Sequence, residues 1–506
     1  MPEPTVPEPT VPMLGRISRR QALTAVGVGA ATVVTGAVGA AGAWRALAPS
    51  GVAGAVTSQP LREPAVLTST DGALDVTLRA AAGATIAGRP TMALAYNGTS
   101  PGPTLSVRPG DVLRVRLQND LTTMTNLHTH GLHVSPEGNS DNVFRAVAPG
   151  ESVGYEYEIP DDHPTGTFWY HPHHHGTVAD QVFGGLFGAL LVTGDDEPPA
   201  DRERVLVVSD TTLTGSGEVA AASHDDAMLG REGTLLLVNG QSRPRIEVAA
   251  GALERWRVVN ACVSRFLDLR LDGHTWGLLG YDGQALHEPS DQESALLAPG
   301  NRVDLLVRAT QSGSFALRTL EVDRGGMAMM GGSTSSPDAA LASVSVAAST
   351  AGPGAAAPSP VGWPASTASV VDLRSSTVDR VRSITMTGGM GMGMGGGGME
   401  FGFDGRSFDA RRVDQQLALG TIEEWTIGNA TMMDHPFHLH VWPMQIVSGP
   451  GRDQGSPPDW RDVVIIPAHG RVTVRVPVRD FGGRTVYHCH IPDHEDLGMM
   501  GVVEAR

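Results

Sequence analysis

Three segments of the chain share one pattern of apolar and polar positions. In each segment an apolar residue is followed three positions later by a glycine and, nine positions after the glycine, by an asparagine. The segments run from Val107 to Asn119, from Val248 to Asn260 and from Leu417 to Asn429. After the first glycine, Leu113, Val115 and Leu117 alternate with polar residues, which is the period of a strand with one buried face. Three copies of a turn followed by such a strand predict three homologous β-domains.

The interval between the second and third copies is the longer one, and it contains a stretch rich in Ala, Pro, Ser and Gly from about residue 331 to residue 367. Such a composition is typical of a linker. Alternating strands joined by turns favour antiparallel sandwiches of the Greek-key kind. We therefore predict an all-β chain with an N-terminal segment at 1–58, domain 1 at 59–198, domain 2 at 199–345, a linker at 346–367 and domain 3 at 368–506.

Composition supports this picture and narrows the functions. Of the 506 residues only 18% are charged, while 63 glycines and 35 prolines are typical of a β-rich protein with many turns. A formal net charge of −17 argues against nucleic acid as a partner and leaves cations or neutral organic molecules as substrates, although solubility alone explains an acidic balance equally well. The length predicts about three domains, each able to bury its own core, and we expect a monomer.

The N-terminal segment has the features of an export signal. A twin arginine at 19–20 precedes an uncharged run of small and weakly apolar residues at 22–44. This combination is typical of the Tat pathway and predicts export to the periplasm, the cell surface or the medium. An uncleaved membrane anchor is the alternative, since the run is long enough to span a bilayer. Residues 1–12 repeat a Pro-Glu-Pro-Thr-Val-Pro motif, so a start at Met13 instead of Met1 is also open.

Candidate chemistry is concentrated in the histidines. The chain has 18 of them, and eight form four His-x-His pairs: His128 and His130, His171 and His173, His438 and His440, and His488 and His490. Side chains two positions apart on a strand share a face, so each pair can direct two imidazoles at one metal site. Eight imidazoles fit a cluster of three copper ions. The pairs occur only in the first and third repeats, which predicts a cluster where domains 1 and 3 meet, with domain 2 mainly a spacer.

The last His-x-His pair encloses one of the two cysteines. On a strand, Cys489 points away from the flanking histidines, so one strand can address two metal sites. His494 and Met499 follow closely, and His435 lies beside the third pair. Two histidines, a thiolate and a weak methionine ligand suit a blue-copper centre. If Cys489 binds copper no disulfide forms, and Cys262, in an apolar stretch, is expected to be a buried small residue.

These four segments resemble the copper-binding motifs of the multicopper oxidases, which in order read HxHG, HxH, HxxHxH and HCHxxxHxxxxM. The resemblance extends from about residue 60 to the end of the chain and is closest to the three-domain bacterial laccases and cuprous oxidases. It implies cupredoxin-like domains and four copper ions. It places His435, Cys489, His494 and Met499 on a type 1 copper, His128 and His438 on a type 2 copper, and His130, His171, His173, His440, His488 and His490 on a pair of type 3 coppers.

Two positions leave alternatives open. The run from His171 to His175 offers two overlapping His-x-His pairs, 171/173 and 173/175, and spacing alone does not choose between them. The preceding Trp-Tyr dipeptide resembles the family's lead-in and favours 171/173. Met500 competes with Met499 for the axial position, and the distance along the chain from the preceding histidine resembles the family pattern for Met499.

The expected centres imply an oxidase. Reduction of oxygen to two waters takes four electrons, whereas the reducing substrate supplies one at a time, so four copper ions store the charge. Electrons collected at the type 1 copper can pass from the sulfur of Cys489 through the backbone to the flanking histidines. Asp141 and Glu495 match the positions of acidic residues that relay protons in related enzymes. The segment around Asp141 departs from the efflux-oxidase motif, and solvated carboxylates are the alternative.

The reducing substrate is less well defined by the sequence. Methionines gather in two glycine-rich segments, at 327–330 and 386–399, and thioethers favour Cu(I). A cuprous site on the second segment would use Met390, Met392, Met394 and Met399, and a loop that binds no metal is the alternative. We predict a laccase-like oxidase of phenols, aromatic amines or Cu(I), with O2 as acceptor. The alternatives are a copper-sequestering or copper-tolerance protein that uses these loops, and a copper nitrite reductase, which does not need eight clustered histidines.

Overall fold

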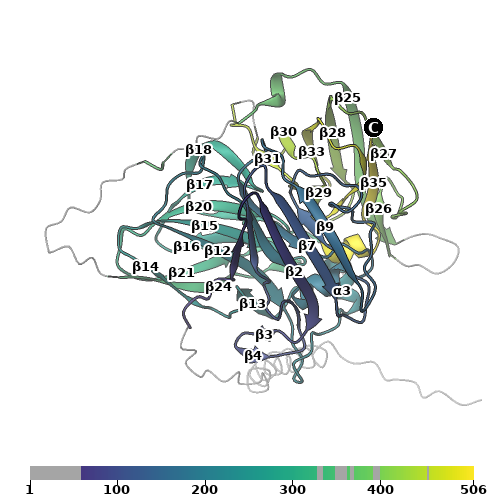
Figure 1. Cartoon of the computed structure of the whole chain (residues 1–506). Helices are drawn as coiled ribbons and strands as arrows, with labels where there is room; N and C mark the ends of the chain where they lie inside the picture. Colours follow the sequence, from purple (N-terminus) through teal and green to yellow (C-terminus); the bar gives the residue numbers. More distant parts are fainter. Residues whose placement is uncertain (1–58, 327–333, 348–361, 365–369, 391–398, 453–454) are drawn as a thin grey trace, which may run out of the picture. The chain divides into compact units, whose positions relative to one another are not determined.

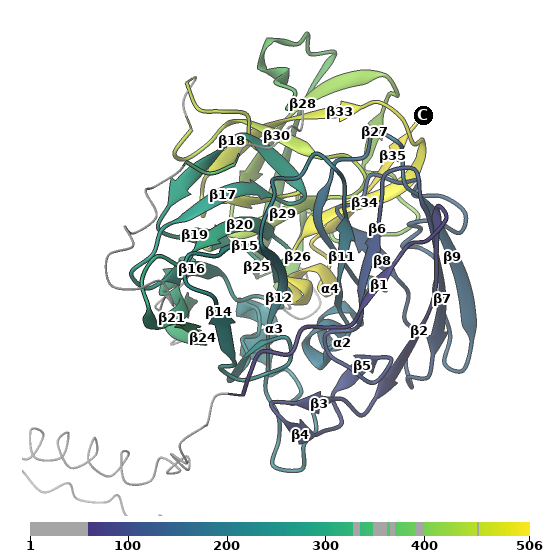
Figure 2. The same cartoon turned by 60° about the vertical axis from the view of Figure 1, so that its left-hand side comes forward.

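The computed structural model describes residues 59–326, 334–347, 362–364, 370–390, 399–452 and 455–506. Within these ranges six large β-sheets form three pairs, and each pair comes from one continuous part of the chain (Figures 1 and 2). The prediction of an all-β chain with three sandwich domains is therefore confirmed. Among the described residues, no helix is long and apolar enough to cross a membrane.

The first pair of sheets encloses a core around Leu78, Leu117 and Phe168. One sheet contains, in spatial order, β1 (Val66–Thr68), β6 (Thr104–Val107), β11 (Gly188–Val192), β10 (Gly166–His171) and β8 (His128–His130). The other contains β5 (Leu94–Tyr96), β2 (Ala73–Ala82), β7 (Val112–Asn119) and β9 (Ser152–Glu158). A small separate hairpin consists of β3 (Thr85–Ile86) and β4 (Arg89–Pro90).

The second pair encloses a core around Trp256, Leu269 and Leu305. Its larger sheet contains β13 (Leu235–Val238), β12 (Arg202–Thr211), β15 (Leu253–Asn260), β20 (Arg302–Arg308), β17 (Trp276–Tyr281) and β18 (Gln284–Gln292). The smaller sheet contains β14 (Arg245–Val248), β24 (Ala339–Val346), β21 (Gly313–Leu320), β16 (Leu267–Leu271) and β19 (Ala295–Leu297). A short pair is formed by β22 (Val322–Asp323) and β23 (Ser335–Ser336).

The third pair encloses a core around Trp425, Phe437 and Tyr487. Its larger sheet contains β26 (Met399–Phe403), β25 (Arg380–Met390), β28 (Thr421–Asn429), β33 (Arg471–Val478), β30 (Met444–Ser448) and β31 (Trp460–Arg461). The smaller sheet contains β27 (Gln415–Leu417), β35 (Met500–Ala505), β34 (Gly483–Cys489), β29 (His435–Leu439) and β32 (Val463–Ile466). Strand β24 continues to Val346, one residue past the expected end of domain 2, and the other domain limits stay predictions.

The internal repeat appears in the structure as a shared turn and a shared asparagine. In every copy the glycine has a left-handed backbone, with φ of 86°, 78° and 79° in chain order, which glycine adopts at no steric cost. The strand after it ends at a buried asparagine, Asn119, Asn260 or Asn429. Each amide group donates to two carbonyl oxygens and accepts from the backbone N–H two residues later. The same asparagine thus stabilises the same loop in all three domains.

The sheets are mixed, whereas the sequence predicted antiparallel sandwiches. In domain 1, β2 pairs with β7 in parallel, and the equivalent parallel pairs are β12 with β15 and β25 with β28. The chain between β2 and β7 passes through β6 of the opposite sheet, so β7 returns beside β2 in the same direction. Alternation of apolar residues identifies a half-buried strand but carries no information on the direction of its neighbour.

Three short helices, one from each domain, lie close together (Figure 2). They are α2 (Val178–Gly184), α3 (His224–Leu229) and α4 (Pro492–Asp496), and α4 contacts both others. The Asp496 carboxylate accepts hydrogen bonds from the backbone N–H groups of Gly176 (2.6 Å) and Ala179 (2.9 Å) at the start of α2. Domain 3 therefore caps a helix of domain 1. A single turn of 3-10 helix, η2 (Leu373–Ser375), precedes β25.

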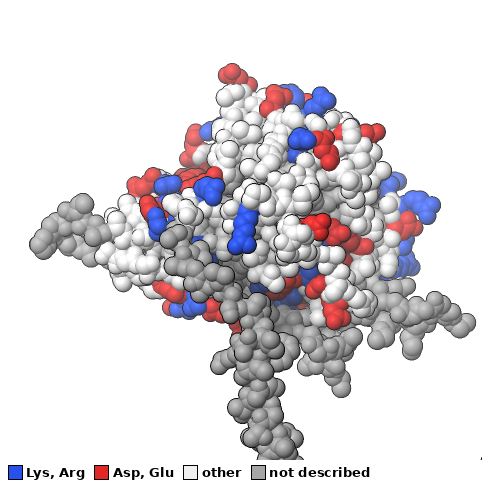
Figure 3. Space-filling model, turned by 90° about the horizontal axis from the view of Figure 1, so that it is seen from below, with Lys and Arg blue, Asp and Glu red and all other residues white. Residues whose placement is uncertain are grey.

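Charged side chains are interspersed on the face of the molecule drawn in Figure 3. Acidic and basic groups alternate there, and most of the described surface on this face carries neither. Exposed ion pairs, such as that of Arg108 with Asp195 (2.9 Å), bring opposite charges together. On this face the described basic side chains do not form one continuous patch, and the expectation that nucleic acid is not a partner stays a prediction.

Candidate metal centre

Two strand pairs bring the four His-x-His motifs together. In domain 1, β8 pairs with β10 so that His128 lies opposite His171. In domain 3, β29 pairs with β34 so that His438 lies opposite His488. The eight imidazoles of the four motifs are all buried. They meet where domains 1 and 3 face each other, as the sequence predicted.

Side-chain alternation on β34 separates two groups of candidate ligands. Cys489 belongs to the hydrophobic core of domain 3. Its neighbours contact imidazoles of domain 1: Nε2 of His488 lies 3.1 Å from Nε2 of His173, and Nε2 of His490 lies 3.2 Å from Nδ1 of His130. One strand therefore contributes to two sites, which is the arrangement expected from its period of two.

Cys489, His435 and His494 form the first group. The Nδ1 atoms of His435 and His494 lie 3.4 Å and 3.9 Å from Cys489 Sγ. Met499 is fully buried in the same core cluster. Burial raises the pKa of the Cys489 thiol well above its usual range, so a thiolate here needs a cation beside it. A sulfur, two imidazoles and a nearby thioether are the donors of a blue-copper site.

The other eight imidazoles form three groups, and within each group the candidate ligand atoms lie within 4.8 Å of one another. The groups are His130, His171 and His490; His173, His440 and His488; and His128 and His438 together with His130. The sequence did not divide the six histidines expected on the type 3 pair. The structure sorts them into two sets of three, and each set draws on both domain 1 and domain 3.

Hydrogen bonds that point away from each group select the nitrogen that faces it. In the Cys489 group, His435 donates from Nε2 to Thr431 Oγ1 (2.8 Å) and His494 donates from Nε2 to the Met228 carbonyl oxygen (3.2 Å). Both Nδ1 atoms are then free of hydrogen and face the sulfur. Such outward partners fix tautomer and ring orientation in metal sites.

The imidazole cluster follows the same rule. His128, His171 and His438 donate from Nδ1, and their acceptors are the Asp141 carboxylate (2.9 Å), the Pro172 carbonyl oxygen (2.8 Å) and the Asp462 carbonyl oxygen (2.8 Å), respectively. Their Nε2 atoms are buried and have no hydrogen-bond partner within the described ranges. Three buried acceptor nitrogens without a hydrogen bond are costly unless ligands lie beside them.

Burial also keeps the cluster neutral. Desolvation lowers the pKa of His440 well below the usual value and the pKa values of His173 and His488 to about 4. The Nε2 atoms of His173 and His440 each lie 3.1 Å from Nε2 of His488. Because His488 Nδ1 donates to the Cys489 carbonyl oxygen, its Nε2 atom has one lone pair and cannot accept from both neighbours, whereas a shared cation satisfies all three nitrogens. The residues present therefore fit bound copper.

Both predicted acidic residues are buried beside the cluster rather than solvated. Asp141 accepts hydrogen bonds from His128 Nδ1 (2.9 Å) and from the backbone N–H of Thr129 (2.9 Å). An oxygen of Glu495 lies 3.2 Å from His488 Nδ1. Burial raises the pKa of each carboxyl to about 7. Their positions let each carboxylate orient an imidazole, and their role as proton relays stays a prediction.

The structure distinguishes the alternatives that the sequence left open at the histidine run and at the axial methionine. His171 and His173 lie within the imidazole groups, whereas His175 is exposed. Met499 shares a core cluster with Cys489, whereas Met500 packs in a separate small cluster. This geometry favours the pair 171/173 and the axial methionine that the family pattern suggested.

Some contacts of the centre had no signal in the sequence. Asp462 accepts a hydrogen bond from His130 Nε2 (3.1 Å) and forms a bidentate ion pair with Arg302 of domain 2. The carbonyl group of Met228, which holds His494, also belongs to domain 2. None of these residues has metal-binding spacing, and a charged residue normally predicts a solvated side chain.

The β25–β26 hairpin contacts the Cys489 group. Phe401 of β26 stacks on His494, with ring centroids 4.3 Å apart and an interplanar angle of 15°. Met390 and Met399 are Cα partners at the end of this strand pair. Met392 and Met394 lie outside the described residues, as does the segment 327–330. Met390 and Met399 therefore belong to the hairpin that contacts the candidate type 1 site.

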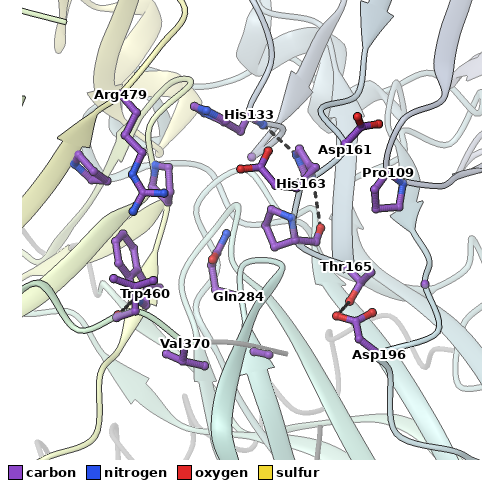
Figure 4. Close-up of a pocket in the computed structure, with 18 of the residues that line it drawn as sticks. Pro109, His133, Asp161, His163, Thr165, Asp196, Gln284, Val370, Trp460 and Arg479 are labelled. Atoms are coloured by element: carbon purple, nitrogen blue, oxygen red, sulfur yellow. Dashed lines mark hydrogen bonds between the residues drawn. The ribbon is translucent and has the colours of Figure 1, made fainter. Parts of the chain in front are cut away.

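A pocket of about 740 Å³ opens where residues of the three domains meet, and Figure 4 shows its lining. Gly131, the residue after β8, lines it, so the pocket reaches the loop beside the imidazole cluster. Within it, His163 Nε2 accepts from the backbone N–H of His133 (3.0 Å), and His163 Nδ1 donates to the Pro164 carbonyl oxygen (2.9 Å). His133 Nε2 lies 2.7 Å from an Asp480 carboxylate oxygen.

The buried His163 predicts a pH-dependent contribution to stability. Burial lowers its pKa from 6.5 to about 4, so its stabilising effect is complete above pH 6.5 and is lost as the pH falls toward 4, because only the unfolded chain takes up the proton readily. Replacing His163 with asparagine should remove about 2 to 3 kcal/mol of the fall in unfolding free energy between pH 7 and pH 4.5. Urea unfolding at both pH values measures this; an equal fall in both proteins contradicts the prediction.

The fold and the site define a class of protein: β-sandwich domains that carry one thiolate–imidazole group and, joined to it by a single strand, a buried cluster of eight imidazoles. Sequence models of the multicopper oxidases match three stretches of the chain, residues 80–197, 167–336 and 373–506. Together these stretches include strands of all three pairs of sheets.

Similar proteins agree with this class. A solved multicopper oxidase of Campylobacter jejuni, described as a metallo-oxidase, is 30% identical, with a TM-score of 0.77 over 88% of this chain and 95% of that chain. A multicopper oxidase of Staphylococcus haemolyticus is 25% identical over 425 residues, covering 81% of this chain and 83% of the relative. A laccase of Bacillus stratosphericus is 27% identical over 483 residues, covering 81% and 90%. The chain belongs to the multicopper oxidase family, copper-binding oxidoreductases that use O2 and a reducing substrate, and the expected cupredoxin-like fold is confirmed.

Proposed function

We propose that the protein couples one-electron oxidation of phenols, aromatic amines or Cu(I) at a type 1 copper to the four-electron reduction of O2 to water at a cluster of three coppers. The observation that carries the proposal is the tripeptide at the end of β34. Cys489 lies in the group that it forms with His435 and His494, while His488 and His490 lie in two different sets of three imidazoles. When bound, the copper ions supply the one-electron steps and the reduction of oxygen.

The proposed ligand sets follow the four groups. The type 1 copper would be held by His435, Cys489, His494 and Met499, the type 2 copper by His128 and His438, one type 3 copper by His130, His171 and His490, and the other by His173, His440 and His488.

The chain itself provides a short and rigid connection between the two centres. Cys489 and His488 are joined by a peptide bond, and His488 Nδ1 also donates a hydrogen bond to the Cys489 carbonyl oxygen (3.0 Å). Both residues are fully buried, which excludes water from the sulfur and from the imidazole. The low polarity around the Cys489 group is one of the properties by which a protein sets the redox potential of a bound copper ion.

A comparison of electron donors tests the proposal. Copper-loaded protein should consume oxygen faster than the donor alone when supplied with a phenol, an aromatic amine or Cu(I), while heat-treated protein should not. Copper-free protein is a second control with the two organic donors, because Cu(I) itself would load it. Fe(II) and Mn(II) serve as further metal donors in the same assay. Absence of oxygen uptake with every donor, despite full copper loading, would contradict the proposal.

A dedicated Cu(I) site is the second candidate. It is favoured by the contact between Phe401 and His494, because Phe401 follows Met399 by two residues on β26. The solved relative from Campylobacter jejuni is described as a metallo-oxidase, which also supports a metal substrate. The alternative role in copper sequestration would use the same methionines without turnover.

Replacing Met390, Met392, Met394 and Met399 together with leucine tests this site, since leucine has a similar volume but no sulfur. We expect oxidation of Cu(I) to fall by about 10-fold or more, as for the loss of soft ligands, while oxidation of a phenol stays within a factor of about 2. The matched control is Met92→Leu, an exposed methionine of domain 1. Equal loss of both activities, or loss of neither, argues against a dedicated site.

Export through the Tat pathway is part of the proposal. It is supported by the twin arginine at 19–20 and the uncharged run at 22–44, which lie outside the described residues. Cell fractionation tests it, and retention of the protein in the cytoplasm would contradict it.

A further inference from the structure

Arg302 of domain 2 contacts both of the domains that carry the imidazoles. It is fully buried at the start of β20. Its two terminal nitrogens donate to the two carboxylate oxygens of Asp462 in domain 3, at 2.7 Å and 2.6 Å. Its Nε donates to the Thr167 carbonyl oxygen on β10 of domain 1 (3.1 Å), the strand that ends at His171. One guanidinium thus ties the two ligand-bearing domains together.

Asp462 transmits this contact to the imidazole cluster. Its Oδ1 accepts a hydrogen bond from His130 Nε2 (3.1 Å), which leaves Nδ1 of His130 directed at His490. Its carbonyl oxygen accepts from His438 Nδ1 (2.8 Å), which leaves Nε2 of His438 unpaired within the described ranges. A single residue therefore selects the tautomer of one imidazole from domain 1 and one from domain 3.

Two further residues of domain 2 support the same point. The buried carboxylate of Asp282 accepts from the backbone N–H groups of Arg302 (2.9 Å), Asp462 (3.2 Å) and Val463 (3.2 Å). Gly300 lies against His490: a Cβ atom there would come within 2.9 Å of three ring atoms. Domain 2 thus holds the backbone around Asp462 as well as its side chain.

The ion pair of Arg302 with Asp462 needs a residue without a side chain beside His130. Gly131, directly after His130, has φ of 88°, and a Cβ atom on it would lie 2.3 Å from both Arg302 Nη2 and Asp462 Oδ2. Only glycine allows the ion pair to approach the strand that carries His130. The glycine of the first motif and the arginine of domain 2 are therefore parts of one arrangement.

We propose that domain 2 positions the imidazole cluster through Arg302, which holds the Asp462 carboxylate and thereby the orientation of His130 and His438. Domain 2 then acts as more than the spacer that its lack of histidine pairs suggested. Arg302 is a positioning residue: it does not touch the proposed copper ions or the substrate. The inference rests on the proposed copper cluster.

The role requires arginine rather than any cation. The planar guanidinium makes two parallel hydrogen bonds to one carboxylate and still reaches Thr167, whereas a lysine ammonium is a compact charge without this fork. Partners of metal-bound histidines typically change metal affinity by ~10- to 100-fold when they are altered. Arg302→Lys keeps the charge and removes the geometry, so it isolates the proposed function of the side chain.

The test compares Arg302→Lys with Arg265→Lys in the copper-loaded protein. Arg265 is also buried in domain 2, but it pairs with Asp210, Glu232 and the Gly233 carbonyl oxygen, all within domain 2. Copper retention is followed against a chelator, with the near-ultraviolet absorption of the type 3 pair and the electron paramagnetic resonance signal of the type 2 copper read separately from the blue type 1 absorption.

For Arg302→Lys we expect the copper cluster to be lost at ~10- to 100-fold lower chelator concentration, with the blue absorption retained. Arg265→Lys should match the unaltered protein in both signals. Unchanged retention in Arg302→Lys, or equal loss in Arg265→Lys, would overturn the inference. If Arg302→Lys does not fold, Asp462→Asn decides: an unaltered type 2 and type 3 spectrum in that variant overturns it too.

The experiment separates this inference from the proposed function. If the unaltered protein never binds more than one copper, the proposed function itself fails. If the unaltered protein binds the full set and Arg302→Lys retains it equally well, only the role of domain 2 fails.

Discussion

Replacing Cys489 with serine should abolish the blue absorption of the copper-loaded protein and lower turnover of a phenol by about 1,000-fold or more, equivalent to about 4 kcal/mol or more of activation free energy. The sulfur is the soft ligand that a type 1 copper needs, and a serine hydroxyl does not replace it. Because Cys489 lies in a different group from the eight paired imidazoles, the type 2 and type 3 spectra should persist. Visible spectroscopy and oxygen uptake measure the two effects.

The matched control for this exchange is Cys262→Ser. Cys262 is the second cysteine, it is equally buried, and it packs in the core of domain 2 beside the Val208 carbonyl oxygen. Its replacement should leave the blue absorption and the turnover per bound copper unchanged. Retention of the blue absorption in Cys489→Ser, or its loss in Cys262→Ser, contradicts the assignment of Cys489.

Replacing Arg231 with methionine should cost about 3 to 5 kcal/mol of unfolding free energy, the typical effect of removing one partner of a buried ion pair. Arg231 of domain 2 donates to Asp493 of α4 from its backbone N–H (3.0 Å), from Nε (2.9 Å) and from Nη2 (2.6 Å), and to Asp180 of α2 from Nη1 (2.6 Å). Methionine fills similar space but leaves the buried Asp493 carboxylate without a cation. Thermal unfolding of copper-free protein measures the change.

The control for this prediction is Arg108→Met. Arg108 pairs with Asp195 at a similar distance, 2.9 Å, but both side chains are exposed, 53% and 95%. Exposed ion pairs contribute little because water screens the charges and two long side chains lose freedom. Arg108→Met should therefore unfold at the same temperature as the unaltered protein. An equal shift in both variants would show that burial of the Arg231 pair has no special effect.

The candidate ligands could be found from the sequence because their signal is local. A His-x-His pair on a strand places two imidazoles on one face, and the residue between them on the other, whatever the rest of the fold does. This is why Cys489 and the histidines around it could be assigned to two separate sites before the structure was known. The threefold repeat was visible for the same reason, since each copy is a turn and one strand.

The contacts that orient those ligands could not be found in this way. Asp462 and Arg302 are 160 residues apart: Arg302 begins β20, and Asp462 lies between β31 and β32. A charged residue at such a position normally indicates a solvated side chain. Their burial depends on how the three domains pack. The alternation of residues along one strand carries no information about that packing. The parallel strand pairs could not be predicted for a related reason: the period of a strand carries no information about the direction of its neighbour.

Stoichiometry tests the proposed function most directly. The copper content of the loaded protein and the oxygen consumed per molecule of a one-electron donor can be measured in one preparation. We expect four copper ions per chain, one O2 consumed for every four donor molecules oxidised, and no release of hydrogen peroxide. One copper per chain, or one O2 for every two donor molecules with hydrogen peroxide as product, would contradict the proposal.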